Sequence, residues 1–156
     1  RQVLKIAAAP DAARAFLPED INPGSIAFSP DGTMVTFLWA KPDEKRSVWG
    51  VPVDGGAYRK LAGLKDSNVR AYRLSPDGSM VYMLTDAALD DQRDTQAKAG
   101  FDARVYEEEL TMARMFAARI GAEIDPSPSQ IAVPGHVSAF RLTPDGKAAI
   151  IETAPT

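Results

Sequence analysis

Three twelve-residue segments of the chain repeat one pattern without gaps, and this repeat restricts the possible folds more than any other feature. The segments are residues 26–37 (IAFSPDGTMVTF), 72–83 (YRLSPDGSMVYM) and 140–151 (FRLTPDGKAAII). In each, apolar residues stand one and three places before a Ser/Thr-Pro-Asp-Gly sequence, and a second apolar-rich run follows it. Period-two alternation on both sides of a short turn predicts a β-hairpin. Three such hairpins in the same register predict a repeat architecture.

The turn sequence itself explains why the chain reverses at these points. Proline holds φ at about −65° in the second turn position, aspartate can hydrogen-bond the nearby backbone, and glycine accepts the positive φ that closes the loop. The residues predicted to build the three turns are Pro30, Asp31 and Gly32; Pro76, Asp77 and Gly78; and Pro144, Asp145 and Gly146.

The residues that follow the first hairpin extend it to a four-stranded unit. Residues 47–53 (SVWGVPV) alternate, residues 54–56 (DGG) predict a turn, and residues 58–61 (YRKL) predict one more strand. Four short strands in roughly 40 residues is the size of one β-propeller blade. We therefore predict an all-β chain, a partial β-propeller of about two and a half four-stranded antiparallel blades. It would comprise a lead-in at 1–24, a blade at 25–63, a second blade at 68–133 and a half blade at 137–156.

The second predicted blade is longer than the first. Pro76 lies 46 residues after Pro30, whereas Pro144 lies 68 residues after Pro76, which leaves about 22 extra residues. We place them in an insert at 87–105, where Asp86 can cap a short helix that Gly100 ends. Residues 107–120 have a helix-forming composition, yet residues 115–121 occupy the repeat position of residues 48–54. We favour a strand from about Met112 to Ile120, because tertiary packing overrides propensity.

Composition excludes several classes of protein and of site. The chain of 156 residues is 45% hydrophobic and 25% charged, which argues against wholesale disorder. A net charge of −3 without a basic run argues against a nucleic-acid partner, and no apolar stretch approaches the roughly 20 residues of a membrane span. Without cysteine there is no disulfide or zinc-thiolate site, and the single histidine, His136, is expected to be structural. We expect no metal and no cofactor.

Residues 48–56 (VWGVPVDGG), together with the Ser-Pro-Asp-Gly hairpin, carry a family resemblance. This pattern resembles the propeller repeat of two groups: the prolyl oligopeptidase family of serine peptidases, and the periplasmic Tol-system protein. Residues 100–109 (GFDARVYEEE) and 17–21 (LPEDI) are similar to bacterial peptidase propellers of the first group, so we favour that family.

The resemblance implies that the chain is a piece of a larger protein. In the family, the catalytic Ser, Asp and His belong to a C-terminal α/β-hydrolase domain, which is absent from this sequence. Because no Gly-x-Ser-x-Gly segment occurs either, we assign no catalytic residue and expect no serine peptidase activity from this chain alone. The propeller would cap the active site and gate or bind a peptide substrate. Its expected partners are the remainder of the same protein and that peptide.

The acidic run Glu107, Glu108 and Glu109 is the candidate binding motif. In dipeptidyl peptidases of this family, a similar Tyr-Glu-Glu-Glu run holds the free amino terminus of the substrate through charge-assisted hydrogen bonds. There a turn of the Ser-Pro-Asp/Asn-Gly kind follows closely, whereas here Thr143 comes 34 residues after Glu109. A solvated acidic turn that leads into a strand is therefore the alternative interpretation of these three residues.

The alternative function is a non-enzymatic propeller of the Tol type that binds another protein in the periplasm. The two hypotheses differ in whether the reading frame continues into a Gly-x-Ser-x-Gly segment. Many bacterial members of the peptidase family are exported, so the resemblance implies a periplasmic or secreted protein, with the cytoplasm still possible.

Overall fold

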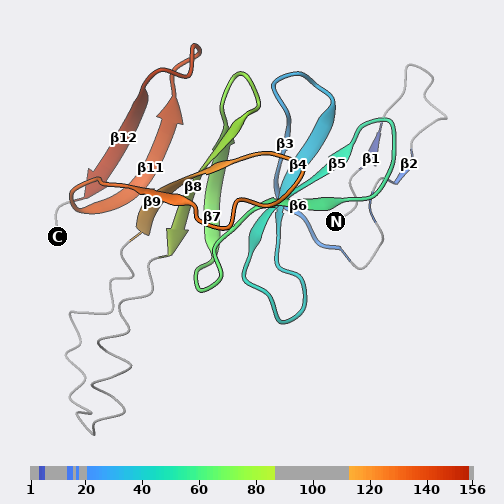
Figure 1. Cartoon of the computed structure of the whole chain (residues 1–156), viewed down its shortest axis with the longest axis horizontal. Helices are drawn as coiled ribbons and strands as arrows, with labels where there is room; N and C mark the ends of the chain where they lie inside the picture. The colour runs from blue at the N-terminus through green and yellow to red at the C-terminus, as the bar shows by residue number, and fades with distance from the viewer. Residues whose placement is uncertain (1–3, 6–13, 16, 18–20, 87–112, 155–156) are drawn as a thin grey trace, which may run out of the picture.

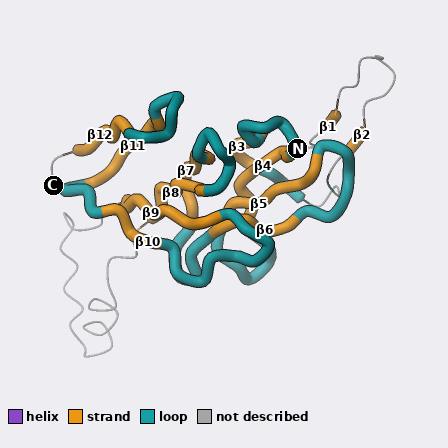
Figure 2. Tube along the Cα trace, turned by 45° about the horizontal axis from the view of Figure 1, so that its top comes forward, coloured by secondary structure: helices purple, strands orange, loops and turns teal. Residues whose placement is uncertain are grey.

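The computed structural model describes residues 4–5, 14–15, 17, 21–86 and 113–154. These residues form β-strands joined by turns and loops, and no helix occurs among them (Figures 1 and 2). The first four-stranded sheet has the order β3 (Gly24–Phe28), β4 (Met34–Trp39), β5 (Ser47–Pro52) and β6 (Arg59–Ala62). The second has the order β7 (Val69–Leu74), β8 (Met80–Asp86), β9 (Ala113–Arg119) and β10 (Ser129–Ile131).

Two smaller sheets complete the described structure. Strands β11 (His136–Leu142) and β12 (Ala149–Ala154) form a two-stranded sheet, and β1 (Leu4–Lys5) pairs with β2 (Arg14–Ala15). All strand pairs are antiparallel. The prediction of an all-β chain with successive sheets of four, four and two strands is thus confirmed, and the arrangement is compatible with partial propeller blades. The predicted helical insert lies outside the described residues.

The three repeated segments form hairpins whose turns lie at one end of the molecule (Figure 1). At each turn the glycine N–H donates to the carbonyl of the residue three before it, as from Gly32 to Ser29 at 2.8 Å. Gly32, Gly78 and Gly146 have φ of 71°, 71° and 68°. The glycines are therefore needed, because a side chain in this left-handed region is strained.

Strand pairing also decides between strand and helix at residues 113–119. These residues form β9, in register with β8, although their composition favours a helix. Met83 faces Phe116 in this ladder as Phe37 faces Trp49 in the first sheet, so the two sheets share one register. The predicted strand is confirmed, because each β9 residue gains a partner on β8 that an isolated helix would lack.

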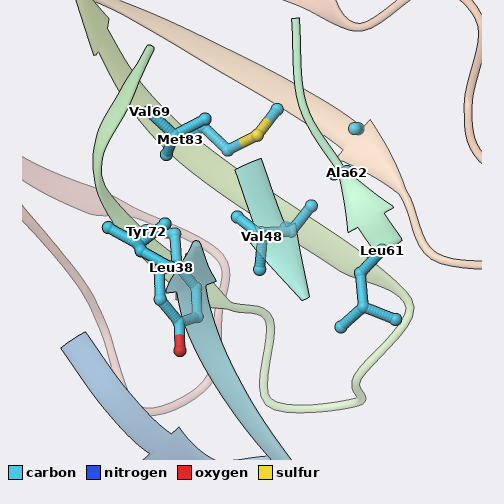
Figure 3. Packing of buried hydrophobic residues seen from close by; sticks show 9 residues of the cluster. Leu38, Val48, Leu61, Ala62, Val69, Tyr72 and Met83 are labelled. Carbon is cyan, nitrogen blue, oxygen red and sulfur yellow. The ribbon is translucent and has the colours of Figure 1, made fainter. Parts of the chain in front are cut away.

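The core lies between successive sheets. One cluster joins Leu38, Val48, Leu61 and Ala62 of the first sheet to Val69, Tyr72, Val81 and Met83 of the second (Figure 3). A second cluster joins Leu84, Ala113 and Met115 of the second sheet to Val137 and Phe140 of the third. The face of the first sheet that points away from the second packs against Leu17 and Ile21. Because the central strands of the first two sheets are covered on both faces, they are largely apolar at consecutive positions.

Candidate functional site

A depression lies where β3 begins and β4 ends. Its volume is about 550 Å³, and Ser25, Leu38, Trp39, Arg46 and Arg70 contribute to its lining. Arg46 directly precedes β5 in the first sheet, whereas Arg70 belongs to β7 in the second. The depression therefore lies at the junction of two sheets, and its lining combines apolar residues with two arginines.

The two arginines differ in how they are held. Arg70 Nε lies 3.2 Å from Asp86 Oδ1, and its side chain is half exposed to solvent. The backbone N–H of Arg46 donates to Asn68 Oδ1 at 2.9 Å, which attaches this loop to the segment before β7. Asp86 therefore offsets the charge of Arg70, while the position of Arg46 is set through its main chain.

Tyr72 links the two sheets next to this depression. Its phenol oxygen lies 2.9 Å from the carbonyl oxygen of Ser25 and 2.8 Å from Thr36 Oγ1. Burial raises the pKa of Tyr72 to about 12, so the phenol stays protonated as a hydrogen-bond donor. Ser25 has a φ of 49°, in the left-handed region. Its carbonyl oxygen accepts a hydrogen bond from Tyr72, a residue of the neighbouring sheet. The rim of the depression is in this way tied to the core.

The apolar wall is held by an aromatic group. Trp49 Nε1 donates to the carbonyl oxygen of Trp39 at 3.1 Å. The rings of Trp39 and Trp49 lie 5.0 Å apart in an edge-on arrangement, and Tyr58 contacts both. These edge-on contacts add to the packing of the first sheet.

His136 has a structural role here. Its Nδ1 accepts a hydrogen bond from the backbone N–H of Ala113 at 3.0 Å, which joins β11 to the start of β9. A smaller depression of about 340 Å³ lies nearby, lined in part by Arg114, Gln130 and Val137. Within the part of the chain that the structure describes, no three His, Cys, Asp or Glu residues come together as metal ligands would.

The predicted site residues have different outcomes. The nine turn residues lie in the three hairpin turns, as the hydrogen bonds there show. Glu107, Glu108 and Glu109 lie outside the described residues, so their proposed role stays a prediction. Sequence reasoning did not single out Arg46 and Arg70. No local signal connects these two arginines, because they meet only through the packing of two sheets.

The depression is suited to binding an anion. Guanidinium groups pair with carboxylates through charge-assisted hydrogen bonds, and the apolar wall can accept an adjoining side chain.

In the described segments no helix is long and apolar enough to cross a membrane. No family model matches the chain, and no curated protein is significantly similar to it.

Proposed function

We propose that this chain is the propeller part of a serine peptidase of the prolyl oligopeptidase family, and that it binds or gates the peptide substrate. The observation that carries the proposal is the depression lined by Arg46 and Arg70. It lies where β3 and β7 begin and β4 ends, away from the hairpin turn between β3 and β4. A peptide carboxylate is the group that such a site would recognise.

The stacked sheets support this proposal in a second way. Successive sheets share buried apolar clusters, which gives a rigid support for the loops at their ends. The peptidase chemistry itself is assigned to a hydrolase domain of the larger protein, following the family resemblance of residues 48–56 and 100–109. The chain's own contribution is then substrate selection and access.

The proposal is tested on the native protein. Antibodies raised against this chain should capture, from the cells that make it, a protein heavier than 16.8 kDa that reacts covalently with a fluorophosphonate probe. Fluorophosphonates phosphonylate an activated serine with loss of fluoride, so labelling reports the hydrolase domain directly. Captured protein that stays unlabelled, while a known serine hydrolase in the same lysate is labelled, would overturn the peptidase assignment and favour the Tol-type binding module.

The role of Arg46 gives a separate prediction. We expect Arg46→Gln in the native enzyme to raise KM for a peptide substrate about tenfold, the loss of one partly solvated charge-assisted hydrogen bond, with kcat nearly unchanged. Lys65→Gln removes the same charge from a nearby exposed loop residue that does not line the depression, and it is expected to leave KM unchanged. Equal KM values for the two variants would remove Arg46 from the binding site.

A further inference from the structure

Two apolar side chains of β3 are exposed, although their counterparts in the other two repeats are buried or partly buried. Phe28 is 71% exposed and Ile26 is 48% exposed. In the repeat, Ile26 occupies the position of Tyr72 in the second sheet and Phe140 in the third. Tyr72 and Phe140 are only 3% and 6% exposed. The position of Ile26 in the first strand is therefore covered in the second and third sheets and exposed in the first sheet.

The covered positions show what covers them. Tyr72 packs in one cluster with Leu38 of β4 and Val48 of β5, in the preceding sheet (Figure 3). Phe140 packs with Leu84 of β8 and Met115 of β9, again in the preceding sheet. Leu38 pairs with Val48 across its ladder and Leu84 pairs with Met115 across its own, so the two covering surfaces are equivalent. In both cases the second and third strands of one sheet cover the first strand of the next.

The corresponding face of the first sheet is only partly covered. Leu17 and Ile21 pack against Val35 and Phe37 of β4, which leaves Ile26 and Phe28 of β3 open. Phe28 faces Val35 across the ladder, so the open side chains continue the covered surface. Exposed neighbouring apolar side chains next to a core cluster are typical of an interaction surface.

We infer that β3 packs against a further β-sheet of the same repeat, located elsewhere in the same protein. That sheet would present aliphatic side chains from its second and third strands, at the positions of Leu38 and Val48. The inference rests on the part of the proposed function that makes this chain a portion of a larger protein. It adds which surface of the first sheet is covered, namely the exposed face of β3, and which side chains cover it, namely aliphatic ones.

A second copy of this chain fits the surface less well. The sheet it could offer is β11–β12, where Glu152 stands at the repeat position of Leu38 and Leu84. Packing that carboxylate against Ile26 would bury a charge without a partner. Among the described strands, β12 also has no third strand on its outer edge to supply the counterpart of Val48.

Hydroxyl-radical footprinting with mass spectrometry tests the inference without a mutation. In the isolated 156-residue chain, Phe28 and Ile26 should be oxidised readily, and light scattering should show a monomer of 16.8 kDa. In the captured native protein, oxidation of Ile26 should fall roughly tenfold, in line with the exposure of Tyr72 and Phe140, and oxidation of Phe28 should fall by less, because its counterparts Leu74 and Leu142 are only partly buried. Ile124, 45% exposed in the loop between β9 and β10, is the matched control and should react equally in both samples.

The oxidation of Phe28 distinguishes the possible occupants of the exposed face of β3. Undiminished oxidation of Phe28 in the native protein would overturn the inference, even if the protein reacts with a fluorophosphonate. Protection of Phe28 in an oligomer of the isolated chain would also overturn it, because a second copy would then be the occupant. Protection of Phe28 in a native protein that lacks fluorophosphonate reactivity would support the added sheet and reject only the peptidase assignment.

Discussion

At the scale of single residues, the hydroxyl before each turn proline has a defined role. Ser29 Oγ donates to Asp31 Oδ1 at 2.6 Å and accepts the backbone N–H of Met34 at 2.9 Å. The Ser29 carbonyl is thereby left to accept the N–H of Gly32. Ser75 and Thr143 make the same contacts in their turns. The hydroxyl thus accepts the backbone N–H in place of the carbonyl, which explains why each repeat has a serine or a threonine at this position.

The turn aspartates make stability depend on pH in the acid range. A hydrogen bond from the Ser75 hydroxyl, supported by bonds from Ser79, lowers the pKa of Asp77 to about 2. Similar bonds lower the pKa of Asp31 and Asp145 from 3.8. Because the folded pKa lies below the unfolded one, the ionised carboxylates stabilise the fold above pH 3.8, and this contribution is lost as the pH falls towards 2.

We therefore expect the urea midpoint of unfolding to drop between pH 4 and pH 2, as followed by tryptophan fluorescence. The combined variant Asp31→Asn, Asp77→Asn and Asp145→Asn should show a smaller drop, since its turn side chains no longer titrate. If the variant retained the full pH dependence of the parent chain, the turn aspartates would not be its source.

The turn glycines offer a matched pair of substitutions. A Cβ on Gly78 would meet no atom within 4 Å, whereas a Cβ on Gly146 would lie 2.5 Å from Pro76 Cδ of the neighbouring turn. Gly78→Ala should cost about 1 kcal/mol through positive φ alone, and Gly146→Ala should cost more because the two turns must also separate. Thermal unfolding measures the stability lost in each variant, and equal losses would show that the two turns can move apart at little cost in free energy.

At the scale of elements, the stabilising unit is the interface between two sheets. Met83 on β8 is fully buried in the cluster between the first and second sheets. Met83→Ala should therefore reduce the free energy of unfolding by about 3 kcal/mol, since it leaves a cavity that neighbouring strands cannot fill. Ile150→Ala on β12, where the side chain is 74% exposed, should change it by less than about 0.5 kcal/mol. Chemical denaturation of both variants provides the measurement, and similar losses would contradict this picture.

The hairpins could be predicted from the sequence, whereas the strand at residues 113–119 could not be predicted with the same certainty. The hairpins were predictable because Pro, Asp and Gly act on the backbone next to them. Residues 113–119 were ambiguous, because Met, Ala, Arg and Phe carry no local signal against a helix. Their strand state follows from pairing with β8, which begins more than 30 residues earlier. Arg46 and Arg70 could not be paired in advance for the same reason, since they belong to different sheets.

At the scale of the whole molecule, the sheets form a linear array in which each packs on its neighbour. In such an array stability is approximately a sum over units and interfaces, so a unit covered on one side is less stable. The third sheet has two strands and shares one cluster with the second sheet, whereas the second sheet is covered on both faces. Local opening should therefore begin at β11 and β12.

Hydrogen exchange of the isolated chain tests this expectation. Amides of β12 should exchange at least about tenfold faster than those of β8, which is paired on both edges and buried on both faces. Amides of β4 provide the control, since β4 is likewise paired on both edges. Equal protection of β12 and β8 would show that the third sheet is covered at its edge in solution.

The hairpins, their turn geometry and the all-β class could be predicted from the sequence, because these depend on interactions between residues close together along the chain. Long-range packing makes residues 113–119 a strand, brings Tyr72 into contact with Ser25 and Thr36 of another sheet, and places two distant arginines around one depression. The physical reason is that sheet pairing and sheet stacking join residues far apart in the chain, and such contacts leave no local pattern by which to recognise them.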